Sequence, residues 1–197
     1  EQGVDVGGIS REFFYLVCNE VFHVKYGMFQ QTPSGTYWFA PFLSCEPITY
    51  QLIGSIVALA IYNSILLPIR FPSLLYKKLW NVPLKLEDYE EIDPDIVNSL
   101  KKLKKSKRKV DVSNMDLMFY ITQDNFGAAV EIPLCEGGLE KQVTNDNLDE
   151  YIELYTNYLL VESIKIQFEK FAFGFNKVMD ATASDKYRSM KIKQLIV

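Results

Sequence analysis

The chain has 197 residues, of which 48% are hydrophobic and 14% aromatic, so it can bury a sizeable core and a disordered chain is excluded. The net charge of -4 excludes a globally basic composition of the kind that binds nucleic acid. The cysteines Cys18, Cys45 and Cys135 are scattered and form no C-x-x-C pair, which predicts reduced thiols in a reducing compartment. No signal peptide is recognisable, and we interpret the chain as a fragment of a longer protein.

The chain opens with GVDVGGISREFF, in which Gly3, Gly7 and Gly8 precede an apolar run. A phosphate-binding loop would need Lys and Ser or Thr directly after its last glycine, and a dinucleotide-binding loop would need the spacing G-x-G-x-x-G. Neither pattern is present, so we interpret the stretch as a turn that leads into a helix over about 10–24, with Ser10 near its N-cap. The apolar residues that recur at helical spacing are Phe13, Phe14, Leu16, Val17 and Val21.

The next segments predict a hairpin and two helices. Met28-Phe29 and Tyr37-Trp38-Phe39 flank QQTPSGT, which is typical of a turn between two short strands. Residues 52–69 carry no charge over 18 positions, the lower limit for a membrane span, but polar residues interrupt them. We favour a buried helix over about 49–66, with a membrane span as the alternative. A short helix is predicted over 73–79.

Asp93-Pro94 predicts the start of a helix that runs to about Lys105. The lysine run over 101–109 is either a solvated helix end or a patch for nucleic acid or another acidic surface. The absence of interleaved aromatic residues favours the solvated end, because a single-strand binder needs stacking platforms.

Short β-like segments follow over 117–122, 128–134 and 141–143. Thr144 or Asn145 is predicted to cap a long helix, in one or two pieces, over about 146–178. A last helix is predicted over 186–197. Helices therefore come first and last, with a small α+β insert between them.

Catalysis by single side chains has little support. The one histidine, His23, is five residues from Cys18, so the two do not share a helix face. Cys135 lies beside an acid in a turn, whereas a reactive thiolate needs a cationic neighbour. No Cys/His cluster has the spacing of a metal site. We therefore expect no catalytic residue, metal or cofactor in this chain.

Apolar residues of the insert have two interpretations. They line a shallow groove with aromatic walls that grips a loop of another protein, or they form the small core of the insert, and the pattern alone favours the core. These residues are Ile96, Leu100, Leu103, Met115, Leu117, Tyr151 and Tyr155.

The opening GVDVGGISREFF resembles the signature G-x-D-x-G-G-[VL]-x-[RK]-E-[FW]-[FL] of HECT ubiquitin ligases, and EQGVD is similar to the start of the type hijacked by papillomavirus. The resemblance covers essentially the whole chain. Its further segments are YGMF (26–29), YWF (37–39), LIG-x-x-x-ALAIYN (52–63), FP-x-x-x-YKKL (71–79), DP-x-x-x-x-SL (93–100), Thr144-Asn145-x-Asn147 and F-x-x-GF (171–175).

This resemblance implies an α+β, mainly helical fold, the N-lobe of a HECT domain. It implies a large helical subdomain over 1–92 and 161–197 and a small α+β subdomain over 93–160 that binds a conjugating enzyme. The C-lobe, which carries the catalytic cysteine, is not matched. The full-length protein is therefore expected to be a ubiquitin-protein transferase, and the fragment is expected to be inactive alone.

The resemblance also implies the partners and the site. The partners are a ubiquitin-conjugating enzyme, ubiquitin, and protein substrates through other regions, with no nucleic acid or membrane, in the cytoplasm or nucleus. In this family a phenylalanine of the conjugating enzyme enters a groove of the small subdomain, and the lysine run would favour an acidic partner surface. By alignment, the wall of the groove comprises Ile96, Ser99, Leu100, Leu103, Met115, Leu117, Tyr151 and Tyr155. The rival classes are a non-catalytic interaction scaffold and a membrane-associated helical protein.

Overall fold

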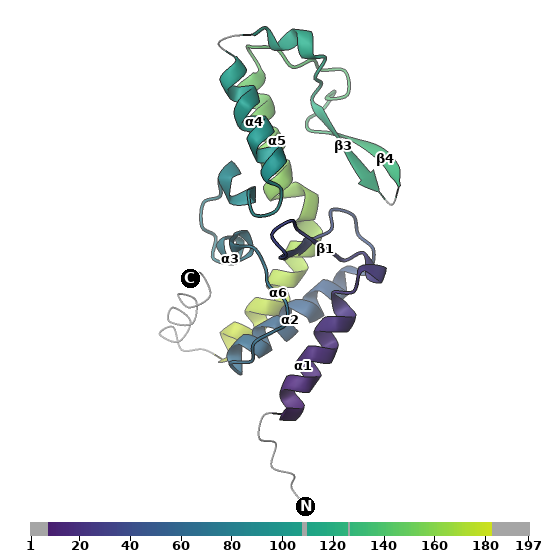
Figure 1. Ribbon diagram of the computed structural model, residues 1–197, viewed down its shortest axis with the longest axis vertical. Coiled ribbons are helices and arrows are strands. Elements are labelled where there is room, and N and C mark those ends of the chain that lie inside the picture. The colour runs from purple at the N-terminus through teal and green to yellow at the C-terminus, as the bar shows by residue number, and fades with distance from the viewer. Residues whose placement is uncertain (1–7, 108–109, 126, 183–197) are drawn as a thin grey trace, which may run out of the picture. The chain divides into compact units, whose positions relative to one another are not determined.

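The computed structural model describes residues 8–107, 110–125 and 127–182 (Figure 1). Gly3, Gly7 and the helix predicted over 186–197 lie outside the described residues. The chain divides into two compact units. Unit 2 is Leu84–Ser163, and unit 1 consists of the described residues of Glu1–Pro83 and Ile164–Val197. Helices dominate both units, and each unit has one two-stranded antiparallel sheet, which confirms the α+β, mainly helical fold.

Unit 1 contains helices and a hairpin close to the predicted positions. Its elements are α1 (Gly8–Val21), a 3-10 turn (Val24–Tyr26), β1 (Phe29–Gln31), β2 (Tyr37–Phe39), α2 (Pro47–Tyr62), α3 (Ser73–Leu79) and α6 (Lys165–Thr182). Phe29 pairs with Phe39 and Gln31 with Tyr37, so the hairpin is confirmed. The apolar side predicted for α1 is wrong in part. Phe14 and Cys18 are buried, but Phe13 and Leu16 are more than half exposed.

The buried helix α2 is shorter than predicted. It ends at Tyr62 and not near residue 66, because the Asn63 side-chain amide donates to the Leu59 carbonyl and Ser64 has a left-handed φ of 57°. Its buried side includes Tyr50, Ile53 and Val57. Across the residues that the structure describes, no helix combines the length and hydrophobicity that a membrane span requires.

Helices α2 and α6 cross closely inside unit 1. A Cβ placed on Gly54 would collide with the Phe171 backbone, and one on Gly174 would collide with the Gln51 carbonyl. The Ser55 hydroxyl donates to the Gly174 carbonyl at 3.1 Å. The two glycines thus let the helix backbones come into contact, and aromatic rings fill the rest of this core. Those rings belong to Phe22, Phe29, Phe39, Tyr50, Phe71 and Phe171.

Unit 2 holds a pair of long helices, a hairpin and two 3-10 turns. Its elements are a first 3-10 turn (Leu86–Tyr89), α4 (Pro94–Ser106), a second 3-10 turn (Val112–Met115), β3 (Tyr120–Asn125), β4 (Ala128–Pro133) and α5 (Leu148–Leu160). Helix α4 agrees with the prediction, and the predicted long helix is interrupted at a 3-10 turn (Glu162–Ile164) before α6.

Two boundaries in unit 2 differ from the prediction. The strand expected from residue 117 begins at Tyr120, although Met118 forms an isolated bridge with Gln142. The N-cap of α5 is Asn147, and not Thr144 or Asn145. Asn145 has another role, since its side-chain oxygen accepts a hydrogen bond from the Val112 backbone N–H at 2.9 Å.

Candidate functional site

Helices α4 and α5 lie side by side in unit 2 and run in opposite directions (Figure 1). The ammonium group of Lys107, just after α4, is 2.6 Å from a carboxylate oxygen of Asp149 in the first turn of α5. At the other end of α4, burial and, to a smaller extent, the negative charge of the Asp93 carboxylate raise the pKa of Tyr155 on α5. These two interactions therefore connect both ends of α4 to α5.

The start of α4 is fixed by its own sequence. The Asp93 carboxylate accepts a hydrogen bond from the Ile96 backbone N–H at 2.9 Å, and Pro94 occupies the first turn, where its missing N–H costs nothing. Val97 and Leu100 are buried, at 0% and 3% exposure. Ile96 and Leu103 are half-buried and Ser99 is exposed, so they lie along one flank of the buried stripe.

Three aromatic rings contact one another in series, two on α5 and one, Phe119, just before β3. The ring of Tyr151 lies 5.4 Å from Phe119 and 5.8 Å from Tyr155, both in edge-to-face geometry. Burial, followed by the neighbouring Tyr155, raises the pKa of Tyr151 to about 12. Both phenols are neutral at physiological pH, and of these two rings Tyr155 is the one that keeps exposed surface.

Met115 and Leu117 are held beside the start of α5 by backbone contacts. The Leu117 carbonyl accepts from the Val143 N–H at 2.8 Å, and the Gln142 side chain donates to the Ser113 carbonyl at 2.9 Å. Met115 is 41% exposed and Leu117 is half-buried. This segment is thereby anchored to the residues that precede Tyr151.

The predicted site residues fall into two groups. Leu100 and Tyr151 are buried and belong to the core of unit 2. The other six keep exposed surface, and we call them the groove residues: Ile96, Ser99, Leu103, Met115, Leu117 and Tyr155.

Two residues that pack or bond beside the predicted site were not among the predicted site residues. Phe119 has no exposed surface and packs against Tyr151, and the Tyr158 hydroxyl donates to the Gln123 side chain at 2.6 Å. The continuous apolar and aromatic run over 117–121 was the available signal for the first. No local pattern connects Tyr158 to a residue 35 positions earlier.

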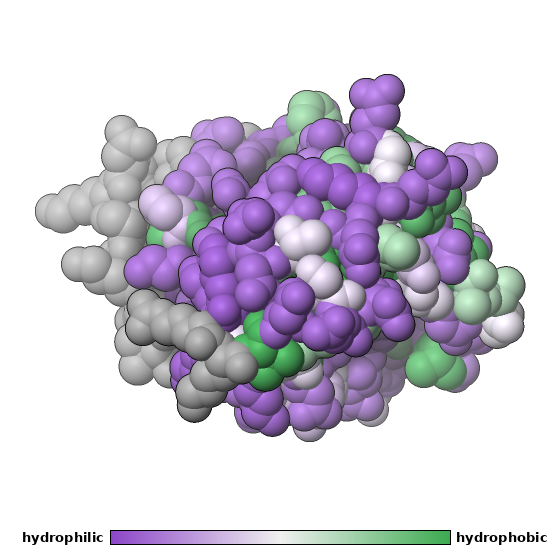
Figure 2. Space-filling view, turned by 90° about the horizontal axis from the view of Figure 1, so that it is seen from above, coloured by the Kyte–Doolittle hydropathy of each residue, from purple (hydrophilic) through white to green (hydrophobic). Residues whose placement is uncertain are grey.

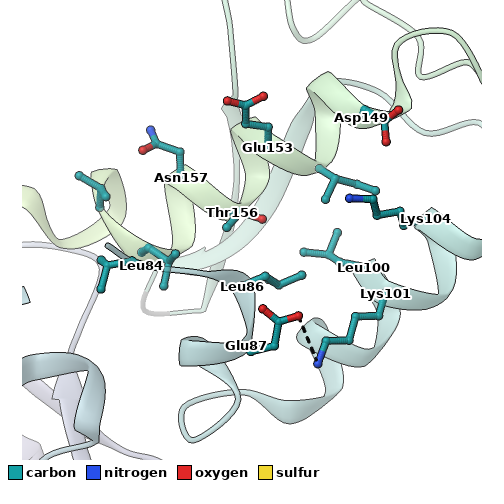
Figure 3. Close-up of a pocket in the computed structure, with 13 residues that line it drawn as sticks. Leu84, Leu86, Glu87, Leu100, Lys101, Lys104, Asp149, Glu153, Thr156 and Asn157 are labelled. Atoms are coloured by element: carbon teal, nitrogen blue, oxygen red, sulfur yellow. Dashed lines mark ion pairs between the residues drawn. The ribbon is translucent and has the colours of Figure 1, made fainter. Parts of the chain in front are cut away.

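A pocket of about 630 Å³ opens on the other flank of the helix pair (Figure 3). In Figure 3, Leu86 and Leu100 lie inside it, and Glu87 faces Lys101 at its edge, with 3.8 Å between carboxylate and ammonium. Of the predicted site residues only Leu100 lines this pocket. The pocket and the groove residues are therefore separate surfaces.

The arrangement of possible metal ligands and the burial of Cys18 bear on metal binding and on thiol reactivity in the described part of the chain. Within residues 8–107, 110–125 and 127–182, no three His, Cys, Asp or Glu side chains gather as metal ligands would. Cys18 is 2% exposed, and burial raises the pKa of its thiol to about 11. It is thus protonated and inaccessible, unlike a nucleophilic cysteine.

The fold is a mainly helical lobe, and unit 2 exposes apolar side chains beside buried aromatic rings. The sequence model of the HECT-domain (ubiquitin-transferase) family matches residues 15–197. Over its whole length the chain is 34% identical to the human probable E3 ubiquitin-protein ligase HECTD2, and the matched part is 27% of that protein. The chain is also 33% identical to human HERC3 and 34% identical to mug30 from Schizosaccharomyces pombe, both named probable E3 ubiquitin-protein ligases. The matched parts are 19% of HERC3 and 24% of mug30, so the chain spans about a quarter or less of these relatives. The chain therefore belongs to the HECT-domain family and corresponds to its N-lobe.

Proposed function

We propose that the chain docks a ubiquitin-charged conjugating enzyme at the groove residues, so that ubiquitin can pass to a cysteine of the C-lobe and then to substrate lysines. The observation that carries this proposal is the set of apolar and aromatic side chains that keep exposed surface along the α4–α5 pair and at Met115 and Leu117. Interface hot spots are of this kind, an apolar anchor held in an aromatic-walled pocket.

The relatives named as ubiquitin ligases support the wider role that we propose for the full-length protein. The C-lobe thiolate would attack the ubiquitin thioester, form a new thioester and release the thiol of the conjugating enzyme. A substrate lysine amine would then attack that thioester, form an isopeptide bond and release the C-lobe thiol. The contribution of the present chain is to hold the donor enzyme in place, which lowers the entropic cost of the first transfer.

Two leucines provide a matched test of docking. Leu103 and Leu86 are both half-buried in unit 2, but Leu103 belongs to the groove residues and Leu86 lines the separate pocket. Binding of the 197-residue chain to a panel of purified conjugating enzymes would be measured by calorimetry. We expect one enzyme to bind, and Leu103→Ala to weaken that binding about tenfold or more, as hot-spot truncations do. Leu86→Ala should leave it unchanged.

The same experiment separates docking from its rival, a non-catalytic interaction scaffold. Loss of binding in both leucine variants, or in neither, would overturn docking at the groove residues. In the full-length protein, Leu103→Ala should also slow the loading of the C-lobe cysteine with ubiquitin. A full-length protein whose C-lobe cysteine is never loaded would leave the scaffold as the better description.

A further inference from the structure

The lysine run of α4 is divided between two flanks of the helix. Lys101 lies 3.8 Å from Glu87 and 3.6 Å from Glu90, and Lys107 is paired with Asp149. Lys104 lines the separate pocket with Asp149 (Figure 3). Acidic side chains of unit 2 therefore accompany all three of these lysines.

Lys102 is different, since it is exposed and no carboxylate among the described residues lies within ion-pair distance of it. It stands three positions after Ser99 and four before Ser106, so it borders the flank that carries the groove residues. Lysines in the last turn of a helix are explained by the helix dipole, as for Lys104 and Lys105, but Lys102 precedes that turn. Its charge has no structural role that the described residues reveal.

Polar side chains lie close to Lys102 along α4. Ser99, about one turn earlier, is exposed, and Ser106, about one turn later, is half-buried. Hydrophilic side chains dominate the face of the molecule that Figure 2 shows. A charge at the polar rim of an apolar contact mainly sets the association rate and the choice of partner. Lys102 therefore suits a rim role and not an anchor role.

We propose that Lys102 pairs with a carboxylate at the edge of the docked conjugating enzyme, so that the chain favours enzymes whose docking surface is acidic on that side. This inference rests on the proposed docking function. The partner is a protein and not a nucleic acid, because the chain carries a net charge of -4 and no aromatic side chain interrupts the lysine run.

Two charge reversals on the same helix provide the test. Lys102→Glu and Lys104→Glu change the net charge equally, but Lys104 faces the separate pocket. Binding of the conjugating enzyme that the wild-type chain captures would be measured at about 50 and 300 mM salt. We expect Lys102→Glu to weaken binding about 5- to 20-fold at low salt, mainly through the association rate, and to flatten the salt dependence. Lys104→Glu should have less than about a twofold effect.

Single Asp→Lys or Glu→Lys substitutions would then be made on that conjugating enzyme. One of these variant enzymes should bind the Lys102→Glu chain as the unchanged enzyme binds the wild-type chain. Equal effects of the two reversals, or no restoring substitution, would overturn the rim pair. Failure of the rim pair is distinguishable from failure of docking, because Leu103→Ala would still weaken binding about tenfold or more if only the rim pair is wrong. A poly(dT) oligonucleotide that binds the chain in a Lys102-dependent way would overturn the choice of a protein partner.

Discussion

The crossing of α2 and α6 leads to a specific prediction about Gly54. A Cβ there would lie less than 3.0 Å from backbone atoms of Phe171, a separation that real Cβ atoms essentially never show. The obstacle is backbone and not the end of a flexible side chain, so the two helices must move apart. Gly54→Ala should therefore destabilise unit 1, although alanine is the better helix former.

The magnitude follows from two opposing effects. Overpacking a tight core costs about 1–3 kcal/mol or more, and a backbone obstacle places this case at or above the upper end. Replacing glycine by alanine inside a helix returns about 1 kcal/mol. We expect a net loss of about 2 kcal/mol, which lowers the thermal midpoint of a unit of this size by roughly 10 °C.

Tryptophan fluorescence during thermal or urea unfolding is the appropriate assay. The two tryptophans of the chain, Trp38 and Trp80, both belong to unit 1, so the signal reports this unit and not unit 2. Gly8→Ala is the matched control, since Gly8 begins α1 and a Cβ there would have no neighbour within 4 Å. We expect the control to change stability by less than about 0.5 kcal/mol.

A second variant tests the reasoning further. Gly174 faces the Gln51 backbone across the same crossing, so moving the helices apart relieves both collisions. Gly54→Ala and Gly174→Ala combined should cost less than the sum of the single substitutions. Additive losses, or a Gly54→Ala chain as stable as Gly8→Ala, would refute the close crossing.

Three further predictions concern capping, thiol access and phenol ionisation. Asp93→Ala should destabilise unit 2 by about 1 kcal/mol in urea unfolding followed by circular dichroism, whereas Asp93→Asn, which keeps the capping oxygen, should cost little. Cys18 should react with iodoacetamide at pH 8 more slowly than the other two cysteines, as measured by mass spectrometry, because it is buried and its pKa is raised to about 11. Burial raises the pKa of Tyr151 and of Tyr158 to about 12, above the value of about 10 in the unfolded chain. The folded state of unit 2 therefore keeps its full stability below pH 10, and it should lose stability as the pH rises toward 12. Absorbance of tyrosinate should then increase together with unfolding, and early ionisation in a folded chain would contradict the burial of these phenols.

Elements with strong local signals were predictable from the sequence. Helix α3 matches its predicted range, α4 begins after the expected Asp93 cap, and the first hairpin surrounds the Pro-Ser-Gly turn. In each case a proline, a capping carboxylate or a turn glycine restricts the backbone near the boundary, whatever the rest of the chain does.

Other features depend on tertiary contacts and were not predictable. Helix α1 has apolar residues on opposite sides, so periodicity alone could not show that Phe14 is buried while Phe13 is exposed. The interruption between α5 and α6 has no Gly or Pro near Val161, where φ is -129°. The placement of Asn145 against Val112 likewise joins residues 33 positions apart. Local propensity carries no information about such contacts.

For the candidate site, the sequence identifies residue types but not their division between core and surface. Leu100 and Tyr155 lie on apolar stripes of α4 and α5, yet Leu100 is 3% exposed whereas Tyr155 keeps exposed surface. Leu100→Ala would remove core packing and cost about 2–5 kcal/mol, so it would weaken binding even if no partner touches Leu100. Leu103 avoids this ambiguity because it is only half-buried. A loss of binding in a Leu103→Ala chain that unfolds at the wild-type midpoint therefore reports a contact with the partner, and the same loss in a Leu100→Ala chain does not.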